Sequence, residues 1–423
     1  MNEGFALSEA LSLLEIEDAL GRIKTQSHRH ANSLAIEGNL WLLKYQKTMT
    51  DGDLEMAVTV SKAALQEMDP NTTSNNSLIF DSVSNAHYFK FRRTGLLGDI
   101  NTAIETCVLA MGTDALTTQQ RWALETKLAT YMLDRTELFP TAEHRLEAIS
   151  HHRKYSEMEG LCPSGRARFL SQFGVSLSRQ YLISGDSRLL DEALRLGYES
   201  TDSSNLQDPK QADIEFSNIA STLFMSFRHT QRFSDLEAAL QISQLAIDNE
   251  VRDDMLERAG MLVTRGGMLT TKYQRYRNTK PEVAQEALDE AIKHGRRAAL
   301  ILKPVGPSSE AFQIHRKSNL LNSIAPWFVT KMMLTGTVDW GQEGITLLRE
   351  ALELRQEDHP ERLSILARLS HILEVQHQVL KSQKDTQAAL ARLEEALKCG
   401  TEAAEATPEL DSDRGERYMC QDK

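Results

Sequence analysis

The stretch SDLEAALQISQLAI, from Ser234 to Ile247, decides the fold of this chain because close copies of it recur along the sequence. GDLEMAVTVSKAAL begins at Gly52, GDINTAIETCVLAM at Gly98 and ARLEEALKCGTEAA at Ala391. Each copy places apolar residues at the spacing of one helix face. The copies therefore predict one helix that returns many times, which indicates a repeat architecture. We call this recurring helix helix B.

One small residue aligns the copies of helix B, and we call it the anchor. Consecutive anchors lie 45 to 53 residues apart, and the residue after each anchor is aliphatic. Seven of the eight copies also have alanine or serine seven residues after the anchor. Small residues two turns apart on one face let a second helix pack closely. The eight anchors are Ala57, Ala103, Ala148, Ala193, Ala239, Ala291, Gly344 and Ala396.

The segment before each helix B carries large apolar residues at helical spacing, and we call it helix A. Examples are SLIFDSVSNAHYFKFRRTG from Ser77, GRARFLSQFGVSLSRQYLI from Gly165 and EFSNIASTLFMSFRHTQRF from Glu215. Large side chains on helix A facing small ones on helix B predict an antiparallel hairpin. Proline disrupts helix interiors, and of the ten prolines only Pro326 falls inside a predicted helix A. We expect a kink or a break there.

These patterns predict an all-α fold, an α-solenoid of about eight antiparallel helical hairpins that stack into a right-handed superhelix with a concave groove. The repeat is longer than the roughly 34 residues of a tetratricopeptide repeat and overlaps the roughly 40–47 residues of HEAT and armadillo repeats. Paired small residues on helix B and aromatic residues on helix A favour an extended tetratricopeptide-like repeat. We expect an N-terminal capping helix in 1–30, the solenoid in 31–410, and a tail or the truncated start of a further repeat in 411–423.

Three stretches, FRRTGLLGDINTAI, FRHTQRFSDLEAAL and EDHPERLSILARLSHIL, resemble the degenerate tetratricopeptide arrays of large fungal proteins. The resemblance runs from about His28 to the end of the sequence. In that family such arrays commonly precede a caspase-like peptidase domain of the CHAT type. The resemblance therefore implies a regulatory or sensing arm. No peptidase domain follows the array in this sequence, so that role needs a partner chain or missing exons.

Composition narrows the class of protein. The net charge is −12 at pH 7, and such a chain repels nucleic acid and anionic membranes at long range, although a local basic patch stays possible. The four cysteines have neither disulfide-framework nor metal-ligand spacing, which favours a reducing compartment. The first residues do not form a signal peptide, and no apolar run approaches bilayer length. We expect a cytoplasmic protein with neither nucleic-acid nor membrane partners.

The sequence gives only weak signals for catalytic, metal-binding or cofactor-binding residues. Cys107 and Cys399 fall inside predicted B helices, where core positions are expected. His144, His151 and Cys162 lack the spacing of a zinc site, and the histidines are expected near turns on the surface. The stretch GMLVTRGGM has no phosphate-loop lysine. We expect no enzyme activity, no metal and no cofactor, with an unrecognised enzyme as the weakest alternative.

The ends of the A helices are basic, and this pattern has two interpretations. Cations near a helix C-terminus interact favourably with the helix dipole, by about 0.3–1 kcal/mol each. Stacked in register, they would instead form a basic ridge that binds an acidic peptide or carboxylate. The first interpretation is favoured and the second stays open. The candidate partner-binding residues are Lys44, Arg92, Arg93, Arg179, Arg228, Lys272 and Arg275.

The function that the sequence favours is a non-catalytic scaffold or adaptor. Its partner would be a protein or peptide, with an acidic one suggested by the basic ridge. The partner would bind on the concave face, where A helices line the groove in arrays of the resembled type. The alternative is the sensor arm of a CHAT-type signalling protein.

Overall fold

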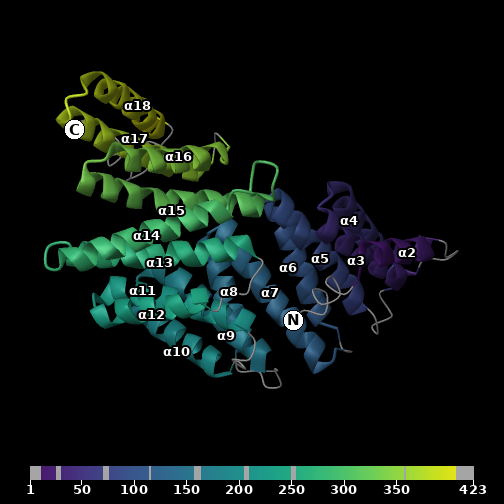
Figure 1. Ribbon diagram of the computed structural model, residues 1–423. Helices are drawn as coiled ribbons and strands as arrows, with labels where there is room; N and C mark the ends of the chain where they lie inside the picture. The colour runs from purple at the N-terminus through teal and green to yellow at the C-terminus, as the bar shows by residue number, and fades with distance from the viewer. Residues whose placement is uncertain are drawn as a thin grey trace. The chain divides into compact units, whose positions relative to one another are not determined.

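The computed structural model describes residues 11–24, 30–69, 76–113, 116–156, 163–203, 209–248, 254–356 and 359–405. In these residues it contains 17 α-helices and no strand, which confirms the all-α class (Figure 1). The chain divides into two compact units, Met1–Asn218 and Ile219–Lys423. The boundary falls within helix α11 (Pro209–Thr230).

Eight A–B hairpins follow one another in the order that the sequence predicts. The first four, after α2 (Leu13–Lys24), are α3 (Ala31–Thr48) with α4 (Asp51–Gln66), α5 (Asn76–Thr94) with α6 (Leu97–Met111), α7 (Thr118–Leu138) with α8 (Ala142–Tyr155), and α9 (Pro163–Ser184) with α10 (Ser187–Ser203). The others are α11 with α12 (Phe233–Asp248), α13 (Met255–Tyr276) with α14 (Pro281–Ile301), α15 (Ala311–Thr335) with α16 (Val338–Glu353), and α17 (Pro360–Ser382) with α18 (Thr386–Glu405).

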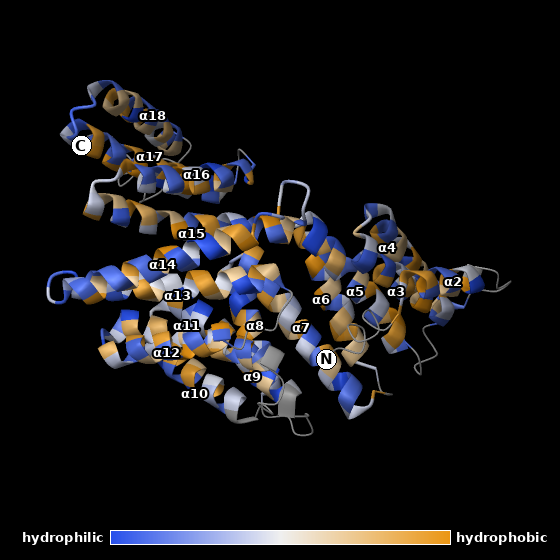
Figure 2. Ribbon diagram, in the orientation of Figure 1, coloured by the Kyte–Doolittle hydropathy of each residue, from blue (hydrophilic) through white to orange (hydrophobic). Residues whose placement is uncertain are grey.

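Consecutive hairpins stack through both kinds of helix. Helices A pack on each other, as α3 does on α5 and α13 on α15, and helices B pack on the next helix A, as α4 does on α5 and α12 on α13. Hydrophobic and hydrophilic residues alternate along the helices, as expected where one face is buried (Figure 2). The fold within each unit is therefore a helical repeat array.

Five of the eight turns between helices A and B have only two residues, and the first of the two adopts a left-handed conformation. The backbone N–H of this residue bonds back to the last turn of helix A; Gly95, for example, donates to the carbonyl of Phe91 (2.7 Å). This is a helix C-cap, and glycine adopts it without strain. The left-handed residues of the two-residue turns are Met49, Gly95, Gly185, Gln231 and Gly336.

All eight anchors are buried, and helix A contributes a second small residue that the sequence analysis missed. The hydroxyl of Ser84 donates to the carbonyl of the anchor Ala103 (2.8 Å), and a Cβ added to Gly174 would lie 3.3 Å from the carbonyl oxygen of Ala193. In these hairpins the helices therefore cross small residue against small residue. Six hairpins have this small residue 19 positions before the anchor: Gly38, Ser84, Ala129, Gly174, Ala220 and Ala325.

The crossing predicts a difference between two substitutions on one helix. Ala239 is fully buried in α12, whereas Gln241, two residues later, is exposed. Ala239→Leu should overpack the crossing and lower the free energy of unfolding by about 1–3 kcal/mol. Gln241→Leu should stay within about 0.5 kcal/mol of the wild type. Thermal unfolding followed by circular dichroism checks this, and an equal or reversed order would contradict the packing described.

Helix α15 runs through Pro326, so the break expected there does not occur. A proline nitrogen cannot donate to the carbonyl four residues earlier, which here belongs to Asn322. The guanidinium of Arg368 in the next helix A donates to that carbonyl instead (3.2 Å). The neighbouring hairpin thus supplies the hydrogen bond that proline removes, and the helix can continue.

Candidate functional site

The structure brings most of the candidate cations into contact with other side chains. The Nζ atom of Lys44 lies 3.2 Å from the Glu17 carboxylate. Arg93 forms two hydrogen bonds with Asp51 (2.7 and 3.1 Å). Arg92, Arg179 and Lys272 also have polar partners. Among the described residues, only two of the seven candidates have no ion pair or side-chain hydrogen bond, and these are the exposed Arg228 and Arg275.

Several of these contacts join a helix A to the helix B of the preceding hairpin. The cations lie near the end of helix A and the acids in the first half of helix B, at sequence separations of 35 or 42 residues. Exposed pairs of this kind stabilise by at most about 1 kcal/mol each, but their repetition favours one register between hairpins. The pairs are Lys90 with Glu55 (3.3 Å), Arg93 with Asp51, Lys272 with Glu237 (3.5 Å), and Lys331 with Asp289.

Polar side chains also join the A helices of the unit Met1–Asn218 to one another. We call this surface, formed by α5, α7, α9 and the start of α11, the A-helix wall. The rings of Tyr88 and Tyr131 stack at 4.2 Å, and burial raises the pKa of both phenols well above the ordinary value. The pairs across the wall are Lys127 with Asp81, Tyr131 with Asn85 (3.2 Å), Tyr88 with Asp134 (2.6 Å), Gln172 with Thr130 (2.8 Å) and Asn218 with Ser171 (2.7 Å).

The A-helix wall offers amide, hydroxyl and carboxylate groups at fixed positions. Asn85, Asp134 and Gln172 are half-buried, so part of each residue reaches the surface, although the Oε1 atom of Gln172 is itself buried. The sequence analysis named the A helices as the binding surface but none of these residues. The two residues of each pair across the wall are 42 to 47 positions apart, close to one repeat. This separation is the signal that could have found them.

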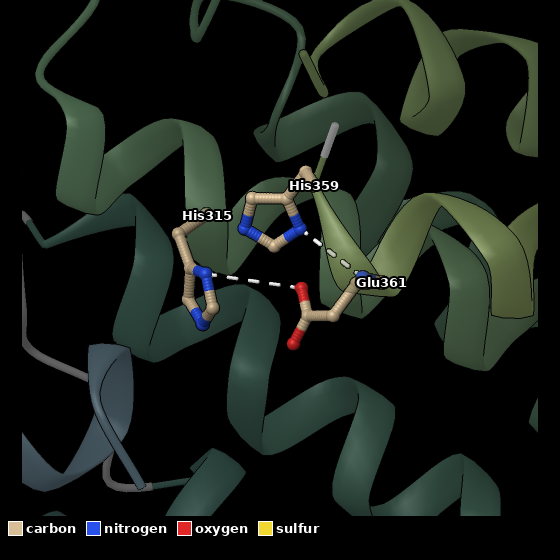
Figure 3. Close-up of side chains that lie close together, drawn as sticks. All are labelled: His315, His359 and Glu361. Atoms are coloured by element: carbon tan, nitrogen blue, oxygen red, sulfur yellow. Dashed lines mark hydrogen bonds and ion pairs between the residues drawn. The ribbon is translucent and has the colours of Figure 1, made fainter. Parts of the chain in front are cut away.

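In the other unit, three potential metal ligands gather where the seventh hairpin meets the eighth. His315 of α15 faces His359 and Glu361, which lie at the start of α17 (Figure 3). One ligand atom of each lies within 4.8 Å of the others. Two histidines and a carboxylate are a common zinc-binding set. The sequence analysis did not bring these residues together.

The guanidinium of Arg355 occupies this cluster. Its Nη1 lies 3.0 Å from His315 Nδ1 and 3.3 Å from His359 Nε2, and its Nη2 forms an ion pair with Glu361. Further bonds reach the Asn319 amide oxygen (2.8 Å), the Ser318 hydroxyl and the His315 carbonyl. Burial lowers the pKa of Arg355, although Glu361 opposes this. A fixed positive charge therefore stands where a metal cation would bind, and we interpret the cluster as a structural hub.

His152 of α8 is buried and His144 and His151 are half-buried, so the expectation of surface histidines is wrong for His152. His152 stacks on Phe173 with ring centroids 5.6 Å apart, and its Nδ1 lies 2.6 Å from the Ala148 carbonyl oxygen. Burial lowers the pKa of His152 to about 3. His151 Nε2 lies 3.2 Å from a carboxylate oxygen of the buried Glu125.

The remaining candidates for chemistry lie in core positions or outside the described residues. Burial raises the pKa of the Cys107 thiol to about 12 and also raises that of Cys399. A nucleophilic cysteine needs the opposite shift, because the thiolate is the reactive form. Cys162, Cys420 and His28 lie outside the described residues. No described helix is both long and apolar enough to cross a bilayer.

No protein-family model matches this sequence, and no curated protein matches it. Among solved structures, the Rap protein complexed with competence and sporulation factor is 12% identical, with 89% of this chain and 100% of that chain covered and a TM-score of 0.41. The S. pombe nuclear import adaptor Nro1 is 13% identical, with 73% and 98% covered and a TM-score of 0.40. Human IFIT1, in a dimer with PPP-AAAA, is 14% identical, with 91% and 94% covered and a TM-score of 0.30. Similarity this low carries no argument about a partner.

Proposed function

We propose that this chain is a non-catalytic scaffold whose A-helix wall binds a protein or peptide. The observation that carries the proposal is the row of half-buried amides and carboxylates, tied together by side-chain hydrogen bonds across consecutive A helices. A surface that is already ordered loses little entropy when it binds. Amide and carboxylate groups held in this way can pair with the N–H and C=O groups of an extended peptide.

To test the wall, peptides that bind the full chain are selected from a displayed library, and their binding to variants of the chain is then measured. Asn85→Ala combined with Gln172→Ala removes two half-buried amides of the wall and should abolish most of the selected binding. A matched control is Gln244→Ala, which removes an amide from helix B of the fifth hairpin. Binding that survives the double change, or falls equally in the control, would contradict the proposed site.

An acidic partner predicts a further effect of charge. Arg92→Glu combined with Arg93→Glu, both in the last turn of α5, should weaken binding of acidic peptides by about tenfold or more, because two attractive charges become repulsive. Helicity, measured by circular dichroism, should stay unchanged. Lys62→Glu with Lys303→Glu makes the same charge change at exposed positions elsewhere and is the matched control. Equal affinities for both double variants would favour the helix-dipole interpretation of these arginines.

The sensor-arm role follows from the resemblance to fungal CHAT-associated arrays and remains the second candidate. This role requires a caspase-like domain, encoded further along the transcript or present on a partner chain. Reading the transcript beyond the codon for Lys423 tests this directly.

A further inference from the structure

The A–B turns of the unit Ile219–Lys423 carry a concentration of exposed cations. We call residues 228–232, 275–280, 333–337 and 381–385 the turn edge of this unit. Seven exposed cations lie in three of these segments against one exposed acid, Asp385, and the segment 333–337 contains no charged residue. The first turns of the following B helices add Asp235, Glu282 and Asp339. The cations are Arg228, Arg232, Arg275, Arg277, Lys280, Lys381 and Lys384.

The four turns form one continuous edge. The rings of Phe233 and Tyr276 meet edge to face at 5.2 Å and join the first turn to the second. Gln383 donates to the Gly336 carbonyl (2.7 Å) and joins the third turn to the fourth. Helix α15 packs on both α13 and α14, so the second and third turns belong to adjacent hairpins. In Figure 1 the α11–α12, α13–α14 and α15–α16 turns lie along the left side of this unit.

Two large apolar side chains project from the middle of this edge. Met333 is 66% exposed and Leu334 is 48% exposed, both in the last turn of α15. Tyr276 and Phe233 are half-buried beside the cations. Exposed apolar tips on one turn, with lysines and arginines on the neighbouring turns, are the composition of surfaces that lie on an anionic membrane.

The shape and the charge of the edge favour a membrane over an acidic peptide. The cations and apolar tips lie on turns that project outward, and such a row can touch an extended surface at several points together. The net charge of −12 does not oppose this. Charges further than about one Debye length, roughly 8 Å at physiological salt, are largely screened. The local cations therefore decide the interaction at contact.

We propose that the turn edge of the unit Ile219–Lys423 docks on anionic phospholipid surfaces, with Met333 and Leu334 entering the headgroup region and the cations of the other three turns contacting lipid phosphates. This differs from the expectation, drawn from the net charge, that the chain has no membrane partner. It is independent of peptide binding at the A-helix wall, which lies in the other unit.

The test is sedimentation of the full chain with vesicles of phosphatidylcholine alone or with about 30% phosphatidylserine. We expect binding to the anionic vesicles only, weakened at about 0.5 M salt. Arg275→Glu with Arg277→Glu should reduce partition about tenfold or more, and Met333→Ser with Leu334→Ser should also reduce it. The matched control, Lys62→Glu with Lys303→Glu, changes the net charge equally away from the edge and should bind like the wild type.

Three results would overturn the proposal. One is a wild-type chain that does not bind anionic vesicles. Another is a control variant that loses as much binding as the edge variants, since net charge alone would then explain the effect. The third is binding to polyglutamate through the same residues without binding to vesicles, which would assign the edge to an acidic protein partner. None of these outcomes bears on the peptide selection at the A-helix wall.

Discussion

Replacing Arg355 with methionine is expected to lower the free energy of unfolding of the unit Ile219–Lys423 by about 3–5 kcal/mol. The side chain of Arg355 is only 3% exposed, and its guanidinium bonds to groups from α15 and from the start of α17. Methionine fills a similar volume but donates nothing. The substitution therefore leaves the Glu361 carboxylate without its charge partner and His315 Nδ1 without its donor. Uncompensated groups of this kind make breaking a buried pair costly.

The matched control for this prediction is Arg349→Met. Arg349 pairs with Glu395 and also joins the seventh hairpin to the eighth, but its side chain is 45% exposed. Its loss should cost less than about 1 kcal/mol. Urea unfolding, followed by the fluorescence of Trp327 and Trp340 in the same unit, measures both variants. Similar small losses for the two arginines would show that the cluster at Arg355 is not a structural hub.

Acidification is expected to destabilise the unit Met1–Asn218 through His152. Burial lowers the pKa of this imidazole from the ordinary 6.5 to about 3. Below pH 6.5 the His152 imidazole is protonated in the unfolded chain, whereas in the folded protein it stays neutral down to about pH 3. The free energy of unfolding should therefore fall as the pH falls through this window, by about 1.4 kcal/mol for each pH unit from this residue alone. Above pH 6.5 the contribution of His152 should not change with pH.

His152→Phe isolates this contribution. Phenylalanine keeps an aromatic ring against Phe173 but cannot take up a proton. It loses the hydrogen bond to the Ala148 carbonyl, so the variant should be less stable at pH 7.5 and should lose less stability on acidification. Urea unfolding at several pH values, followed by Trp122 fluorescence, gives the two slopes. Parallel slopes would mean that His152 is not the group that resists protonation.

The predictions that the structure confirms are those that depend on residues close together in the sequence. The eight A–B hairpins follow from helical periodicity and from the regular spacing of the anchors, because a helix and its antiparallel neighbour form through local contacts. The arginine-threonine-glycine of FRRTG marks a turn for the same reason, since Gly95 adopts the left-handed conformation that a helix C-cap needs.

The predictions that fail or fall short concern contacts between hairpins. The break at Pro326 is absent because Arg368, one hairpin later, supplies the missing hydrogen bond. The basic ends of the A helices meet acids of neighbouring B helices, which neither sequence interpretation considered. His152 is buried because Phe169 and Phe173 of the next hairpin pack against it.

The sequence by itself thus determined the helices, their pairing and the small anchor of each helix B, since these depend on periodicity within about fifty residues. Only the tertiary structure decided which polar groups meet, from the A-helix wall to the cluster around Arg355 and the turn edge. The physical reason is that these contacts depend on the register between stacked hairpins. That register is set by close packing of many side chains together, and a shift of one helical turn would exchange every partner.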